Sequence, residues 1–147
     1  LTLQRNRYNE AELIWENPLD PNDKVSSKDL LRSPEVYGFF NLSYQVLPKL
    51  SLKANLNYSG PMLVPHVIDP DTERTQIKRS PNFFDFGLIA DYQLMESEDW
   101  LLELSGGVQN IFNAYQNDFE RGAKRDASYI YGPLQPRSFV LGLQLKM

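Results

Sequence analysis

The feature that most constrains the fold is the alternation of apolar and polar residues along the chain. It is clearest in residues 50–59, where polar residues separate Leu50, Leu52, Ala54, Leu56 and Tyr58. Successive side chains of a β-strand point to opposite faces, so this segment predicts a strand with one apolar and one polar face. No segment shows the period of an amphipathic helix.

The same alternation recurs along most of the sequence. We predict strands at 36–46, 50–59, 82–94, 100–112 and 137–147. A sixth, weaker strand is predicted from residue 1 to about residue 15, where Arg5 and Arg7 interrupt the apolar face. The sequence therefore predicts an all-β chain of six antiparallel strands.

The connections between these strands alternate strictly in length. Those at 47–49 and 95–99 are short, whereas those at 16–35, 61–81 and 113–136 are long, and we expect the long ones to lack regular structure. Alternation of this kind is typical of outer-membrane barrels, which have short periplasmic turns and long extracellular loops. Such barrels need about eight strands, so six strands indicate part of a larger barrel. The alternative is a soluble all-β binding module, a sandwich or small barrel, that packs its apolar faces together.

Composition excludes several classes of function. Lys and Arg number 15 against 19 Asp and Glu, so the net charge of −4 disfavours a nucleic-acid partner. Without cysteine and with a single histidine, the chain has no disulfide, no thiolate metal site and no multi-histidine metal site. No apolar run is long enough for a helical membrane span. No signal peptide is visible in the sequence, which begins at Leu1, so we expect either a mature chain or a piece cut from a longer one.

No catalytic constellation is evident. Nothing resembles a nucleophile elbow, a phosphate-binding loop or a metal-protease helix, so we expect no enzymatic activity, no catalytic residue and no bound cofactor or metal. The sequences around Asp20 and Asp69 supply oxygen ligands of the kind that calcium uses, but neither has the spacing of a calcium loop. Asp-Pro sequences are also ordinary turn formers.

Candidate ligand-contacting residues lie in the long connections. His66 has two interpretations, as a ligand to haem iron or contact to cargo, and as an ordinary exposed loop histidine. Basic residues that suit an anionic cargo such as a ferric catecholate are Arg74, Lys78, Arg79, Arg121, Lys124 and Arg125. Acidic residues share both loops, which favours a solvated surface with weak ion pairs.

The last long connection is the most aromatic. It contains Tyr115, Phe119, Tyr129 and Tyr131. Exposed aromatic rings at a barrel mouth can stack on a cargo. They can equally pack the loop onto itself as a compact lid, which is the interpretation that we favour.

Several segments resemble one known family. Residues 107–113 read G-V-Q-N-I-F-N, which resembles a segment near the end of TonB-dependent outer-membrane receptors. Five further segments are similar, in their order and spacing, to one branch of that family. They are R-S-P at 32–34, V-Y-G-F at 36–39, M-L-V-P-H at 62–66, Y-I-Y-G-P at 129–133 and P-R-S-F at 136–139. The resemblance covers essentially the whole chain and maps to the C-terminal end of the receptor.

The resemblance implies a fold and a function. It implies that residues 1–147 are the C-terminal six strands of a barrel of about 22 strands in the outer membrane of a Gram-negative bacterium, without the N-terminal plug. It implies active uptake of a scarce nutrient, of the ferric siderophore, haem, cobalamin or glycan class, energised by the TonB complex through the absent N-terminal part.

The final strand carries a further expectation. The resemblance implies that it faces lipid and is read by the barrel-assembly machinery through Phe139, Leu141, Leu143 and Leu145. Members of the family usually end in an aromatic residue, whereas this chain ends in Met147 after Lys146.

Overall fold

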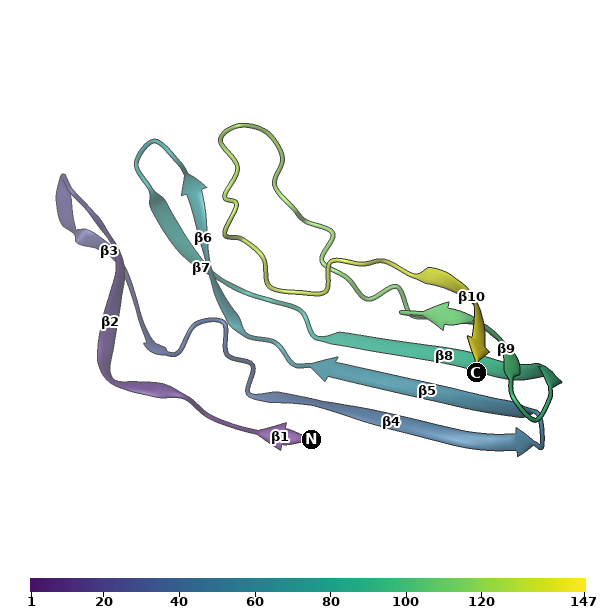
Figure 1. Cartoon of the computed structure of the whole chain (residues 1–147). Coiled ribbons are helices and arrows are strands. Elements are labelled where there is room, and N and C mark those ends of the chain that lie inside the picture. The colour runs from purple at the N-terminus through teal and green to yellow at the C-terminus, as the bar shows by residue number, and fades with distance from the viewer. The chain divides into compact units, whose positions relative to one another are not determined.

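The computed structural model describes residues 1–147 and contains ten β-strands and no helix (Figure 1). The strands are β1 (Thr2–Leu3), β2 (Arg7–Asn17), β3 (Asp20–Asp29), β4 (Val36–Leu47), β5 (Leu50–Ser59), β6 (Leu63–Asp69), β7 (Arg74–Arg79), β8 (Phe83–Glu96), β9 (Leu101–Gln109) and β10 (Ser138–Lys146). The prediction of an all-β chain with antiparallel sheets is confirmed. No helix is present that could cross a membrane.

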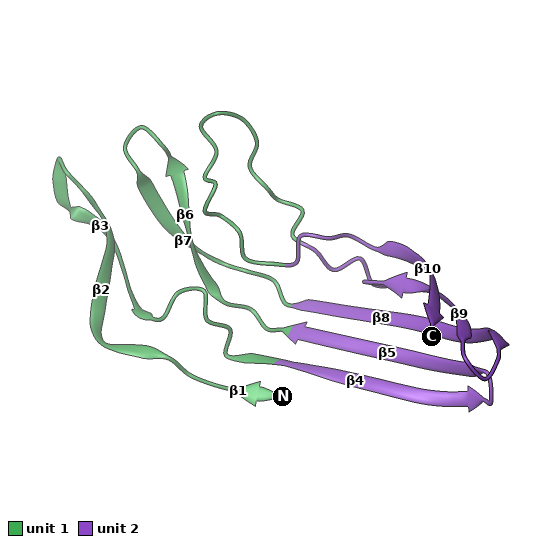
Figure 2. Cartoon of the chain, in the orientation of Figure 1, with its two compact units in different colours: residues 1–37, 59–82, 116–132 green, residues 38–58, 83–115, 133–147 purple.

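The chain divides into two compact units (Figure 2). Unit 1 comprises residues 1–37, 59–82 and 116–132, and unit 2 comprises residues 38–58, 83–115 and 133–147. Unit 1 contains the two hairpins β2–β3 and β6–β7 together with most of the last long connection. Unit 2 contains most of β4 and β5 together with β8, β9 and β10.

The main sheet has six strands in the order β1-β4-β5-β8-β9-β10, with β1 and β10 at its open edges. In unit 1, β1 pairs with the first two residues of β4 through Thr2 and Leu3. In unit 2, β8, β9 and β10 pair antiparallel over most of their lengths. A two-residue turn at 48–49 joins β4 to β5, and the four residues 97–100 join β8 to β9, so both connections are short, as predicted.

The register of unit 2 separates the side chains into two faces. Cross-strand rows on one face are Leu88–Val108–Phe139 and Tyr92–Leu104–Leu143. Rows on the other face are Asp91–Ser105–Gly142 and Gln93–Glu103–Gln144. Alternation in the sequence therefore becomes one apolar and one polar face, as expected for strands.

Two of the long connections were predicted wrongly as structureless. Residues 16–35 contain β3, which pairs with β2, and residues 61–81 contain the β6–β7 hairpin. The predicted first strand is also divided, because β1 ends at Leu3 and β2 begins at Arg7. The third long connection, 113–136, contains no strand, as predicted.

Candidate ligand-binding loops

Unit 1 encloses a small polar core between the β6–β7 hairpin and the last long connection. His66 lies in strand β6 and is only 6% exposed, so its assignment to an exposed loop was wrong. Its Nε2 lies 2.5 Å from Oε1 of Glu120, and its ring stacks on Tyr129 with the ring centroids 4.0 Å apart. The buried Nδ1 has no hydrogen-bond partner. These contacts leave His66 enclosed by protein on its ring face and at Nε2.

Two carboxylates of the last connection complete this core. The second oxygen of Glu120 accepts a hydrogen bond of 2.7 Å from the backbone N–H of Asp126. Asp126 in turn accepts a hydrogen bond of 2.9 Å from the backbone N–H of Val67 in β6. The connection is therefore fastened to the hairpin by both carboxylates.

These hydrogen bonds lower the pKa of both the Glu120 and the Asp126 carboxyl groups. The N–H of Asp126 and the ring of His66 stabilise the carboxylate of Glu120, so its pKa lies below the ordinary value of 4.5. Burial raises the pKa of Asp126, but hydrogen bonds from Ser128 and from the Val67 N–H more than offset burial, so the net pKa is lowered. Both groups are therefore ionised at neutral pH.

Tyr129 and Tyr131 pack the last connection onto itself. Tyr129 is 5% exposed, and its hydroxyl donates to Asp118, as does that of Tyr131. The fully buried amide of Gln116 donates to the carbonyl of Tyr129 and accepts from the N–H of Tyr131. Burial, together with hydrogen bonding to Asp118, raises the pKa of both tyrosines. The two rings therefore pack within their own connection, with their centroids 5.1 Å apart.

The other aromatic candidates do not join this core. Phe119 is 37% exposed in unit 1. Tyr115 belongs to unit 2, where it follows a turn held by Asn110. The structure therefore brings together only two of the four predicted aromatic residues.

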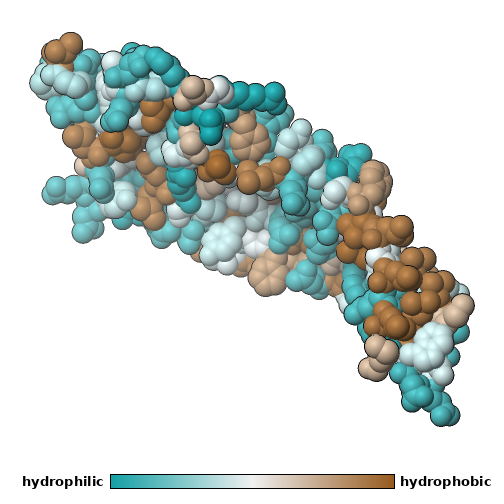
Figure 3. All heavy atoms as spheres, turned by 45° about the horizontal axis from the view of Figure 1, so that its top comes forward, coloured by the Kyte–Doolittle hydropathy of each residue, from teal (hydrophilic) through white to brown (hydrophobic).

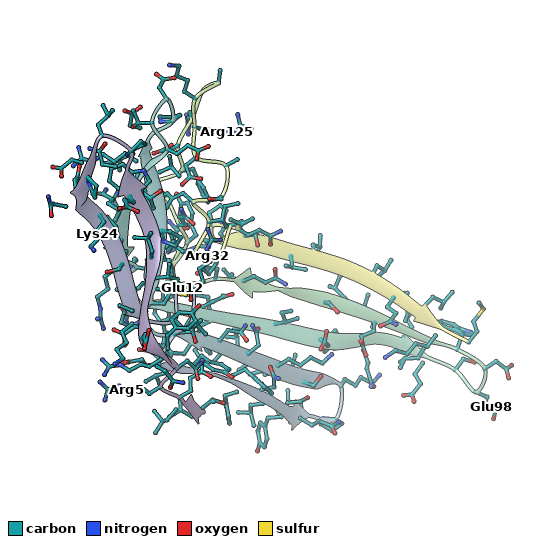
Figure 4. All side chains as sticks on the ribbon, turned by 90° about the vertical axis from the view of Figure 1, so that its left-hand side faces the viewer. Arg5, Glu12, Lys24, Arg32, Glu98 and Arg125 are labelled. Carbon is teal, nitrogen blue, oxygen red and sulfur yellow. The ribbon has the colours of Figure 1, made fainter.

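The basic candidates are dispersed over unit 1, and Figure 4 labels Arg125 among the side chains drawn as sticks. Lys78 lies over the ring of Tyr129 at 5.1 Å, Lys124 pairs with Asp71 at 2.6 Å, and Arg125 donates to the carbonyl of Gly122. Arg79 lines a cavity of only about 60 Å³ near the strand ends. The side chain of Arg121 is exposed. The basic candidates therefore do not form one cationic surface.

A larger hollow lies between the tips of the two hairpins of unit 1. Its volume is about 630 Å³, and its lining includes Trp15, Asn17 and Asp23 from the first hairpin and residues 69–74 from the second. Trp15 and Glu73 also line an adjoining hollow of about 350 Å³ that reaches Arg125. Trp15 thus lies between two open spaces.

The acidic residues considered for calcium act as turn formers instead. Asp20 accepts hydrogen bonds from the N–H and the amide of Asn22. Asp69 accepts from the N–H of Asp71 and from the hydroxyl of Thr72. No group of three or more histidine, cysteine or acidic side chains is placed to hold a metal ion.

Sequence reasoning missed several residues that build this region. Glu120 lies 54 positions from His66, and Asp126 lies 59 positions from Val67. Gln116 bonds backbone groups 13 and 15 positions away within its own connection. No periodic signal links these residues to their partners. Trp15 was placed at the end of a weak predicted strand. The one signal that could have marked it is a large aromatic residue shortly before the turn-forming Asn17-Pro18 and Asp20-Pro21 sequences.

Comparison with known proteins adds no relative. No family model, curated protein or solved structure matches the chain.

Proposed function

We propose that the chain is the C-terminal part of the barrel of a TonB-dependent outer-membrane receptor, which takes up a scarce nutrient by active transport. In this proposal unit 2 supplies membrane-spanning strands, and unit 1 supplies extracellular loops. The TonB complex acts through an N-terminal part outside these residues. The chain by itself is a scaffold and loop surface, not an enzyme.

The observation that carries the proposal is the exposed apolar face of unit 2. Hydrophobic residues make up 41% of the sequence, yet only Val64, Phe83 and Tyr129 are buried. On the terminal strand, Phe139 and Leu141 are 81% and 82% exposed. Figure 3 shows hydrophobic side chains gathered into a dense patch at the surface. Soluble monomers rarely leave so large an apolar surface uncovered, whereas a lipid-facing wall requires it.

The opposite face of the same sheet fits an aqueous lumen. Lys53 pairs with Asp91 at 2.7 Å, and the hydroxyl of Ser105 donates to the same carboxylate at 2.6 Å. Lys146 pairs with Glu103 at 3.2 Å. Charged groups on one face and leucines on the other are the alternation that a barrel wall in a membrane needs.

The open edges of the sheet support a larger assembly. A sheet edge presents unpaired N–H and C=O groups, which within lipid would be costly unless another strand paired with them. Further strands of the same barrel would satisfy β1 and β10. Together with the family resemblance, this favours a segment of a large barrel over a free-standing small one.

Fractionation of the native cells tests the proposal. An antibody to residues 113–136 should detect an outer-membrane band several-fold heavier than 17.0 kDa that changes mobility when the sample is boiled. A soluble band near 17.0 kDa that does not shift would overturn the receptor proposal and favour a soluble all-β binding module.

A further inference from the structure

We propose that the hollow between the two hairpin tips of unit 1 binds a ligand that presents a guanidinium or ammonium group. The inference deepens the proposed function and rests on it in one respect, namely that the ligand is cargo. It specifies that the cargo carries a positively charged group, whereas the proposed function leaves the charge of the cargo open.

The charge of the lining is the first observation. Four carboxylates line the hollow, from Asp23, Asp69, Asp71 and Glu73, against the single guanidinium of Arg74. Lys124 neutralises Asp71 from outside the hollow through contacts of 2.6 and 2.8 Å. Including Lys124, the site keeps a net charge of about −2. An anionic cargo would be repelled here, whereas a cation would be attracted.

The available carboxylate is the second observation. Both oxygens of Asp69 accept hydrogen bonds within its own turn, and Asp23 accepts from Asn17. Glu73 has no hydrogen bond or ion pair to its carboxylate, and it borders both hollows. Its backbone has a φ of 53°, which is uncommon for a residue other than glycine. Glu73 is therefore the carboxylate most available to an incoming cation.

The aromatic wall is the third observation. The indole N–H of Trp15 donates to the carbonyl of Thr72 at 3.3 Å, which fixes the ring across the two hairpins. The guanidinium of Arg74 already lies over this ring at 5.9 Å and 3.9 Å from a carboxylate oxygen of Asp23. The chain thus places a guanidinium of its own between an indole face and a carboxylate. A ligand cation would use the same two kinds of contact.

This arrangement makes an unusual prediction about Arg74. Because its guanidinium occupies the indole face and adds positive charge, it competes with the ligand cation. Replacing it with glutamine should therefore tighten binding. A purely structural role for Arg74 predicts the reverse, since removing a residue that only holds the hollow together would weaken binding.

The test is a fluorescence titration of the full chain in detergent micelles. Trp15 and Trp100 are the only tryptophans, so Trp100→Phe makes the signal specific for Trp15. Tri-arginine should bind about tenfold more tightly than tri-citrulline, its uncharged isostere, and added salt should reduce the difference. Equal affinity for the two peptides, or tighter binding of neutral maltotriose or of a tri-glutamate anion, would overturn the inference.

Three variants sharpen the test. Glu73→Gln should weaken tri-arginine binding several-fold while preserving shape, and Arg74→Gln should tighten it. The matched control is Glu10→Gln, an exposed carboxylate of β2 that does not line the hollow, and it should leave binding unchanged. Unchanged binding in Glu73→Gln together with weaker binding in Arg74→Gln would also overturn the inference.

The two proposals fail separately. A soluble native protein whose chain still binds tri-arginine would overturn the receptor and leave the cation site standing. An outer-membrane barrel whose chain does not distinguish tri-arginine from tri-citrulline would overturn the cation site alone.

Discussion

Unit 2 leaves its large apolar side chains on the surface, with Leu143 68% exposed, whereas unit 1 buries polar groups such as His66 and Gln116. One face of the sheet of unit 2 is therefore largely apolar and uncovered. The loops of unit 1 instead satisfy their polar groups with one another, through carboxylates that accept backbone N–H groups. Under the proposed function, lipid should stabilise unit 2, whereas hydrogen bonds within the loops should stabilise unit 1.

The largest expected effect comes from a charge on the apolar face. Leu143→Arg, in the row with Leu104 and Tyr92, should cost about 2–4 kcal/mol in a lipid bilayer. Its neighbour Gln144 points to the polar face, so Gln144→Arg should cost less than about 1 kcal/mol. The free energy of unfolding in lipid vesicles measures both.

The outcome separates the two environments. If the two arginine variants lose equal stability in vesicles, lipid does not cover one face of β10 in preference to the other. The contrast drawn between the apolar face of unit 2 and its polar face would then be wrong. If Leu143→Arg destabilises a chain that folds without lipid, the apolar face is covered by protein, as in the soluble alternative.

The next effect concerns the turn that joins unit 2's strands to the last connection. Asn110 is 4% exposed and has a φ of 49°, and its side chain bonds both backbone groups of Ala114 and the carbonyl of Gln135. Asn110→Ala leaves these groups without partners and should cost about 2 kcal/mol in thermal or chemical unfolding.

Asn57→Ala is the matched control for this variant. Asn57 is an exposed asparagine of β5, and its replacement should change stability by less than about 0.5 kcal/mol. A similar loss in both variants would mean that the turn at Asn110 does not depend on its buried amide.

The strands of unit 2 could be predicted because their alternation reflects a difference between two environments. Strand β3 could not be predicted, since its residues other than Pro21 and Val25 are polar and no apolar face marks it. It forms by pairing with β2. Strand β6 was missed because Pro65 lies within it, and proline normally argues against a strand interior. The sequences of β3, β6 and β7 lack the regular apolar–polar alternation that marks the strands of unit 2.

The candidate site was predictable only residue by residue. His66, Tyr129 and Tyr131 were chosen from their chemistry, but the partners Glu120 and Asp118 were not. Glu120 lies 54 positions from His66, and hydrogen bonds across such a separation leave no trace in local periodicity. Long-range polar contacts therefore need coordinates, whereas a two-faced strand does not.

A smaller effect tests the polar core of unit 1. Tyr129→Phe removes the hydroxyl that donates to Asp118 but keeps the ring that stacks on His66, and it should cost about 1 kcal/mol. The control is Tyr8→Phe, because Tyr8 is an exposed tyrosine of β2. If the two substitutions have the same effect on unfolding, the hydroxyl of Tyr129 does not stabilise unit 1.

The smallest effect is the response of the two units to acid. The folded-state pKa values of Glu120 and Asp126 lie below their ordinary values of 4.5 and 3.8, so their stabilisation is present above those values and is lost as pH falls through the lowered ones. Hydrogen exchange at the N–H groups of Val67 and Asp126, corrected for intrinsic rates, should therefore quicken below about pH 4. Glu120→Gln removes one titrating group and should flatten this response at Asp126.

The amides of β10 bond to backbone carbonyls of β9, which do not titrate, so their protection should hold over the same range. Equal loss of protection in both units would mean that acid opens the molecule as one body, and the loops would then have no polar core of their own.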